Sequence, residues 1–170
     1  VDVRLELVDG VGLVPMRVAE RAHVRAYSFR RFLQKALPRH LVELPEEDPL
    51  ARAKLPRLAR LPEAIARRWP SARSLDDLAI DRSVPHVAGT AGGSIAGLAT
   101  LRRFLQARLP RYARERSQPE VEAQSWLSPY LHFGHVGVHE VFAAVAEHES
   151  WSVARLAGEV TGVARGWWGM

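Results

Sequence analysis

The sequence predicts a mainly α-helical protein that is preceded by one short β-strand. Apolar residues recur at helical spacing in several stretches after residue 20. Strict alternation of apolar and polar residues, which is typical of a strand with one buried face, occurs at the N-terminus. With 170 residues, 47% of them hydrophobic and 25% charged, the chain is large enough to bury a core.

The predicted strand covers Val1–Leu7, and Asp9 and Gly10 end it. One strand cannot form a sheet alone, so we expect its partners upstream or in a second copy of the chain. The sequence begins with valine and stops after Trp167 and Trp168, two adjacent aromatic residues that need a packing partner. We therefore interpret both ends as cuts through a longer protein.

An amphipathic helix with a basic face is predicted between Glu20 and Leu37, and Pro38 is expected to end it. Six prolines punctuate residues 44–85 and allow only short helices there, at Pro62–Arg68 and Ser74–Leu78. This stretch is therefore interpreted as a linker.

Helices return after the glycine-rich residues 89–97. Ser94 is the expected N-cap of a helix that runs to Leu109, and Pro110 is expected to break or kink it before Tyr112. Further helical patterns run over residues 128–131 and 138–145, separated by glycines.

Composition excludes several kinds of chemistry. The absence of cysteine excludes disulfides, thiolate catalysis and cysteine-based zinc sites. The formal charge of +5 comes almost wholly from arginine, since Lys35 and Lys54 are the only lysines, and this favours a nucleic acid or a phosphate-bearing cofactor. No apolar run is long enough to span a membrane, and no signal peptide is evident. We therefore expect a cytoplasmic location and no membrane partner.

Two other stretches, one rich in glycine and one containing three histidines, only weakly resemble a phosphate loop and a metal site. The residues around Gly92 and Gly97 suggest a phosphate loop, but Leu98 stands where that loop needs lysine, so a flexible lead-in to a helix is the better interpretation. His132, His135 and His139 have metal-site spacing, but the intervening glycines interrupt the helix that would align them. We interpret them as packing or surface residues and predict no metal site.

The most specific signal lies after residue 111. The strings Tyr112-Ala-Arg-Glu-Arg-Ser-Gln-Pro119 and Ala123-Gln-Ser-Trp-Leu-Ser-Pro-Tyr-Leu-His-Phe-Gly134 resemble the flavin-phosphate segment of the photolyase and cryptochrome family. Supporting matches are Ala26-Tyr-Ser-Phe-Arg-Arg-Phe-Leu-Gln-Lys35, Gly92-Gly-Ser94 and Leu101-Arg-Arg-Phe-Leu105, and the terminal Gly-Trp-Trp-Gly is similar to the class II subgroup. Together these matches cover nearly the whole chain.

The resemblance implies a division of the chain. Residues 1–15 would be the end of the α/β antenna domain, with its last strand. Residues 16–90 would be the proline-rich interdomain linker. Residues 91–170 would be the first part of the all-helical FAD-binding domain, cut short at its C-terminal side.

The same resemblance implies the cofactor site. Tyr112 would donate its hydroxyl to the diphosphate of FAD, and the segment Gln124, Ser125, Trp126, Leu127 and Ser128 would wrap the phosphates with backbone N–H groups and two serine hydroxyls. Gln124 departs from the family, which usually has threonine there. The catalytic residues are expected beyond Met170, and the tryptophans are given a packing role before any role in electron transfer.

The implied activity of the parent protein is light-driven repair of cyclobutane pyrimidine dimers by electron transfer from reduced FAD. Its partner would be DNA containing pyrimidine dimers, the complete protein would be a monomer, and an antenna chromophore would belong to the N-terminal domain. The 170-residue piece is expected to be inactive alone. Two alternatives stay open: a cryptochrome-like flavin photoreceptor without repair activity, and a non-catalytic remnant with exposed Trp167 and Trp168.

Overall fold

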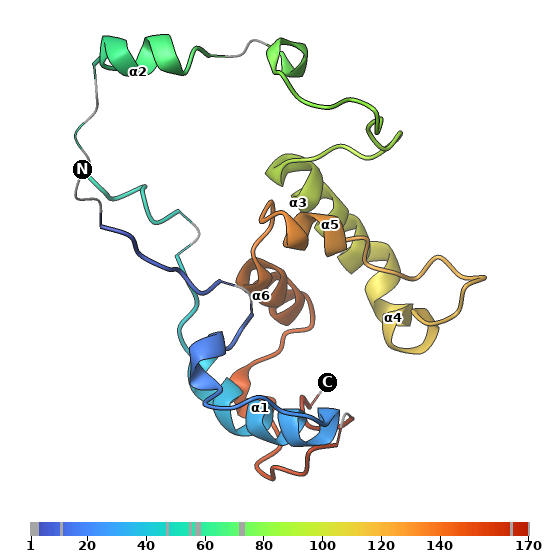
Figure 1. Ribbon diagram of the computed structural model, residues 1–170. Coiled ribbons are helices and arrows are strands. Elements are labelled where there is room, and N and C mark those ends of the chain that lie inside the picture. The colour runs from blue at the N-terminus through green and yellow to red at the C-terminus, as the bar shows by residue number, and fades with distance from the viewer. Residues whose placement is uncertain are drawn as a thin grey trace. The chain divides into compact units, whose positions relative to one another are not determined.

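The computed structural model describes residues 4–10, 12–46, 48–54, 56, 59–71, 74–163 and 165–169. These residues form helices joined by irregular segments, and none of them forms a strand (Figure 1). The predicted mainly α-helical class is therefore confirmed. The chain divides into two compact units, one of Val1–Glu47 with Ala91–Met170 and one of Asp48–Thr90. Among the described helices none has the length and apolar character that crossing a membrane requires.

The predicted N-terminal strand is wrong over residues 4–7, and residues 1–3 lie outside the described ones. Leu5 and Leu7 are each 86% exposed, so the apolar side chains of the alternating pattern are not buried against a core. A strand needs a neighbouring strand to satisfy its backbone N–H and C=O groups, and the described part of the chain offers none.

The first unit contains the one-turn helix η1 (Met16–Val18) and the helix α1 (Ala26–His40). α1 begins six residues after the predicted start and continues through Pro38, which was expected to end it. Pro38 lies in the last turn, where its fixed φ is compatible with the helix and few residues follow. The N–H of Leu41 closes the helix by donating to the carbonyl of Leu37 at 3.1 Å.

Three helical segments then follow one another without a break (Figure 1): α3 (Ser94–Arg103), η3 (Phe104–Arg108) and α4 (Leu109–Glu115). A break or a kink was predicted at Pro110. The helix does not break there, but η3, a segment of π-helix, lies directly before Pro110 and makes the helix irregular. A π-turn widens the backbone and is a known way to accommodate an interruption in the i→i−4 bonding pattern. Pro110 then occupies the first turn of α4, where its missing N–H is harmless.

The rest of this unit consists of α5 (Ser128–His132), α6 (Val138–His148) and the one-turn helix η4 (Val153–Arg155), as the sequence pattern indicated for α5 and α6. One core cluster consists of Leu37, Leu41, Trp151 and Trp167. Trp167 is 4% exposed, and Trp168 packs beside it at 5.2 Å between ring centroids. The exposed tryptophan pair of the remnant hypothesis is therefore not found.

The unit Asp48–Thr90 contains α2 (Glu63–Arg68) and the one-turn helix η2 (Leu75–Asp77). Both short helices were predicted, and α2 starts directly after Pro62. Trp69, the residue that follows α2, is exposed, as are the other described side chains between residues 48 and 90.

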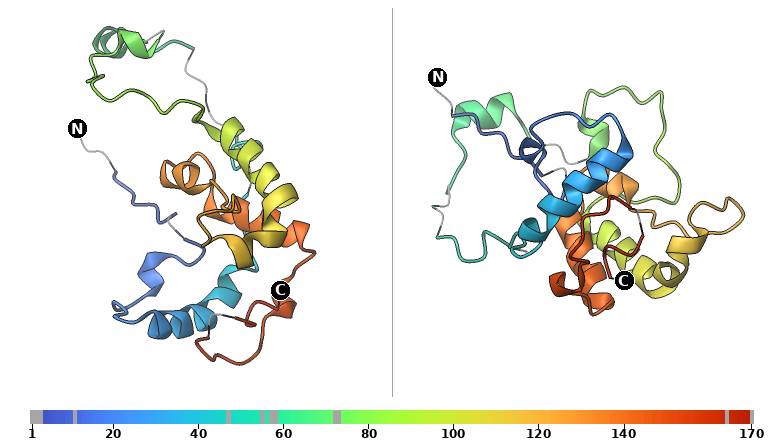
Figure 2. Two further views of the ribbon diagram at one scale, coloured as in Figure 1. Left: turned by 90° about the vertical axis from the view of Figure 1, so that its right-hand side faces the viewer. Right: turned by 90° about the horizontal axis from the view of Figure 1, so that it is seen from below.

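A buried glutamine joins α1 to the C-terminal segment, and Figure 2 shows the two running side by side. Gln34 is 6% exposed. Its Oε1 accepts from the N–H of Gly162 at 2.7 Å, and its Nε2 donates to the carbonyl of Val163 at 3.1 Å. The Nε of Arg30 donates to the carbonyl of Gly162 at 2.9 Å. Gly162 has a φ of +75°, which favours glycine.

We expect Gln34→Leu to destabilise the protein by about 2 kcal/mol, because it leaves two backbone groups without their partner. Urea unfolding followed by circular dichroism measures the change. Gln106→Leu is the matched control, since Gln106 is exposed on η3. Equal unfolding midpoints for the two variants would contradict the role of Gln34.

α3 packs closely against the segment Tyr130–Val136 at Gly97. A Cβ added at Gly97 would collide with Cγ2 of Val136 and lie 3.1 Å from Cδ1 of Tyr130. Two hydrogen bonds support this approach: the Tyr130 hydroxyl donates to the carbonyl of Ala91 at 2.9 Å, and the N–H of Gly93 donates to Nδ1 of His135 at 3.2 Å. The close packing therefore requires glycine at position 97.

Gly97→Ala should lower the free energy of unfolding by roughly 1–3 kcal/mol, despite the better helix propensity of alanine, because overpacking forces Val136 and α3 apart. Thermal denaturation measures this. Gly158→Ala is the control, because a Cβ there meets nothing within 4 Å. A Gly97→Ala protein as stable as the control would refute the close approach.

Candidate cofactor-binding site

A pocket of about 410 Å³ lies between the end of α4 and the start of α5. Apart from one proline, its lining residues are polar or aromatic, and all come from two short stretches of sequence: Tyr112, Arg116, Ser117, Gln124, Ser125, Trp126, Ser128 and Pro129. Five of the six predicted site residues are therefore brought together. The sixth, Leu127, is not among the lining residues.

Tyr112 is held by aromatic and cationic contacts at the end of the long helix. Its ring meets the ring of Phe104 edge-on, at 5.2 Å between centroids and an interplanar angle of 84°. The guanidinium of Arg116, one helical turn later, lies 5.5 Å from the centroid of the Tyr112 ring. These contacts fix the ring where the pocket opens.

The segment before α5 is tied to η3 by Arg108. Its Nη2 forms an ion pair with Oε1 of Glu122 at 2.8 Å, and its Nη1 donates to the carbonyl of Gln124 at 3.5 Å. The backbone then turns sharply, with Trp126 at a φ of +60° and the N–H of Leu127 bonded to Oγ of Ser125 at 3.4 Å. Because of this turn, the side chains of the adjacent residues Trp126 and Leu127 lie in different surroundings.

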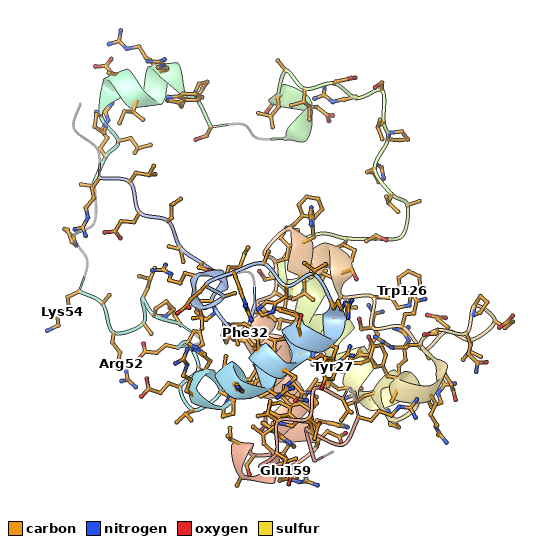
Figure 3. All side chains as sticks on the ribbon, turned by 60° about the horizontal axis from the view of Figure 1, so that its bottom comes forward. Tyr27, Phe32, Arg52, Lys54, Trp126 and Glu159 are labelled. Carbon is orange, nitrogen blue, oxygen red and sulfur yellow. The ribbon has the colours of Figure 1, made fainter. Side chains whose placement is uncertain are left out.

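Trp126 and Leu127 consequently have opposite surroundings. Trp126 lines the pocket and is 54% exposed (Figure 3). Leu127 is 2% exposed and packs in a second core cluster with Leu101 and Phe104. The apolar side chain of Leu127 thus anchors the segment, while its polar neighbours face the pocket.

Sequence reasoning missed Arg116, Ser117 and Pro129 as lining residues. Arg116 had a usable signal, because it stands four residues after Tyr112 and so falls on the same face of a helix. Of the three histidines weighed as metal ligands, His135 accepts the N–H of Gly93. Within the described ranges no three potential metal ligands gather.

The lining residues offer hydrogen-bond donors of several kinds. Tyr112, Ser117, Ser125 and Ser128 carry hydroxyls, Gln124 carries an amide and Arg116 carries a guanidinium. None of the eight lining side chains is a carboxylate. The pocket therefore suits an anionic group with several acceptor oxygens, such as a phosphate or diphosphate.

We expect Leu127→Ala to destabilise the protein by about 2–5 kcal/mol, because it empties a buried position. Trp126→Ala should change stability much less, since the indole is largely exposed. Denaturant titration of both variants tests this contrast. A larger loss for Trp126→Ala would mean that the two side chains exchange places.

Comparison with known proteins shows which proteins the sequence is similar to. No family model matches the sequence, and no solved structure matches it. The chain is 33% identical over 144 residues to the deoxyribodipyrimidine photo-lyase of Potorous tridactylus, covering 84% of this chain and 26% of that protein. It is 38% identical over 113 residues to the protein of that name from Thermus thermophilus, covering 60% of this chain and 27% of the relative.

The photo-lyase of Arabidopsis thaliana is 31% identical over 137 residues, which cover 76% of this chain and 26% of that protein. The chain thus spans only a quarter of the length of these relatives. The matches confirm the resemblance that the strings after residue 111 indicated. Over most of its length, the chain is therefore similar to one part of the photolyase-family proteins.

Proposed function

We propose that this chain is part of an enzyme that uses light to repair cyclobutane pyrimidine dimers in DNA, and that its pocket holds the diphosphate of FAD. The observation that carries the proposal is the convergence of Tyr112 with Gln124, Ser125 and Ser128 around one pocket. These residues lie in the strings that resemble the flavin-phosphate segment of the family. The similarity to proteins named deoxyribodipyrimidine photo-lyase supports the same conclusion.

The chemistry of the donors fits a diphosphate. Hydroxyl and amide groups stabilise phosphate oxygens without burying an unpaired charge, and each hydrogen bond to a charged acceptor contributes about 1.5–3 kcal/mol. The hydroxyl of Ser125 accepts the N–H of Leu127, which leaves its own proton free to be donated. Gln124, where the family usually has threonine, has a longer reach and can still donate through its amide.

In the proposed enzyme, reduced FAD supplies the electron that splits the dimer after light absorption. The residues of this chain bind and orient. Tyr112 and the two serines would hold the phosphates, and the exposed indole of Trp126 offers an aromatic face at the rim of the pocket. The turn fixed by Arg108 and Leu127 would keep these donors in place before the ligand arrives.

We also propose that residues 91–170 belong to the FAD-binding domain, that residues 16–90 connect it to an antenna domain, and that residues 1–15 end that antenna domain. The exposed side chains of the unit Asp48–Thr90 support a connecting role. Residues of α1 pack on the C-terminal segment through Gln34, so part of the proposed linker contributes to the core of the first unit.

The proposed partner of the whole protein is DNA that contains pyrimidine dimers, bound by a monomer in the cytoplasm, with an antenna chromophore in the antenna domain. A photoreceptor without repair activity is the competing function. The relatives cited above are named photo-lyases, and no contact in the described residues favours the photoreceptor.

We expect Tyr112→Phe to weaken FAD binding about tenfold or more, because one hydrogen bond to a charged phosphate is lost. Flavin fluorescence titration of the purified protein measures the dissociation constant. Tyr27→Phe is the control, since Tyr27 lies on α1 and does not line the pocket. Equal affinities of the two variants for FAD would show that the Tyr112 hydroxyl does not bind the cofactor.

The activity itself is tested by incubating the complete protein, of which this chain is proposed to be a part, with FAD, a reductant and an oligonucleotide that carries one thymine dimer. We expect the dimer to disappear under blue light and to persist in the dark, as measured by chromatography of the digested strand. Persistence in both conditions, in a protein that holds flavin, would favour the photoreceptor function.

A further inference from the structure

A second pocket of about 600 Å³ lies between α1 and the segment that precedes it. It shares no residue with the candidate cofactor-binding site. Three of its lining side chains are cationic, namely Arg21, Arg31 and Lys35, against one carboxylate, Glu20. We propose that this pocket and the adjoining face of α1 bind the phosphate backbone of a single nucleic-acid strand.

The charges of this surface are not consumed by partners within the protein. Among the described residues no ion pair involves Arg21, Arg31 or Lys35, and all three are exposed. The guanidinium of Arg31 lies 5.9 Å from the centroid of the Tyr27 ring, which restrains its position without neutralising it. The surface therefore presents free positive charge to an anion.

The cations form a row rather than a single cluster. Arg31, Lys35 and Arg39 are spaced by four residues on α1, so they lie on one face and span about 12 Å along the helix. The helix from Ala26 to His40 contains no aspartate or glutamate. A row of like charges at regular intervals matches a polyanion with regularly repeated phosphates better than it matches one isolated phosphate.

The pocket also has an aromatic wall, which favours a strand with accessible bases. His23 and Phe32 both line it, with ring centroids 5.1 Å apart and an interplanar angle of 30°. Figure 3 places Phe32 on α1, the helix that carries the cationic row. Proteins that bind single strands combine such a basic track with aromatic rings on which bases stack. The volume is of the size that receives one small organic group.

This inference goes beyond the proposed function, because it requires neither light, nor flavin, nor a damaged base. It is tested with the full chain and a short, undamaged oligothymidylate strand in the dark, using fluorescence anisotropy at several salt concentrations. Each phosphate contact contributes about 0.7 to the slope of log K against log salt for a single strand. The variant Arg31→Gln with Lys35→Gln should therefore show a slope shallower by about 1.4.

Arg52→Gln with Lys54→Gln is the matched control. It removes the same two kinds of charge from exposed positions in the other unit (Figure 3), and its slope should equal that of the unaltered protein. Lys35→Gln with Arg39→Gln is a second variant on the same row, which keeps Arg31 beside Tyr27 and should reduce the slope similarly. Circular dichroism verifies that each variant is folded.

Three results would overturn the proposal. The first is that the unaltered chain fails to bind the strand. The second is that the row variants and the control have the same salt slope. The third is that a free mononucleotide competes as well as the strand at equal phosphate concentration. The last result would assign the pocket to a small phosphorylated ligand. Loss of flavin binding or of repair activity would not affect this measurement, so the two proposals fail separately.

Discussion

The close packing of α3 on the segment Tyr130–Val136 at Gly97 is the constraint on which the candidate cofactor-binding site depends. Tyr112 stands at the far end of the long helix that α3 begins, and Ser128 begins α5, which leads into the packed segment. The two walls of the pocket therefore belong to elements whose separation is set at Gly97 and at the buried contacts of Leu127. Both anchors lie outside the pocket.

The π-turn of η3 adds a second geometric condition. One extra residue in a helical turn rotates everything after it by about 100° relative to a regular α-helix. Tyr112 follows this turn and still packs edge-on against Phe104, which lies within it. Arg108, in the same turn, contacts Glu122 and the carbonyl of Gln124, and Gln124 belongs to the opposite wall of the pocket. A local feature placed before Pro110 therefore orients both sides of the site.

Much of this arrangement could be predicted from the sequence. Periodicity identified α5 and α6, and Pro62 marked the start of α2, because these signals act within one or two helical turns. The sequence could not decide between a break and a kink at Pro110, and it placed the end of α1 too early at Pro38. The effect of a proline depends on the turns beside it, and these are known only in the structure. The strand at Val1–Leu7 was wrong over residues 4–7 because an alternating pattern does not supply a partner strand.

The candidate site could be predicted as a set of residues but not as a geometry. The resemblance named Tyr112 and residues 124–128, yet it treated Leu127 like its neighbours, because only the φ of +60° at Trp126 separates their side chains. It also assigned no role to Arg116, whose place beside Tyr112 depends on α4 continuing past Pro110. Contacts that depend on a turn or on the continuation of a helix can be located only in the folded structure.

The most direct test of the central claim is an experimental structure of the protein with FAD bound. We expect diphosphate oxygens within hydrogen-bond distance of the Tyr112 hydroxyl and of the Ser125 and Ser128 hydroxyls or N–H groups, with Leu127 still packed on Leu101 and Phe104. A diphosphate bound away from these residues, with the pocket between α4 and α5 filled by protein side chains, would contradict it.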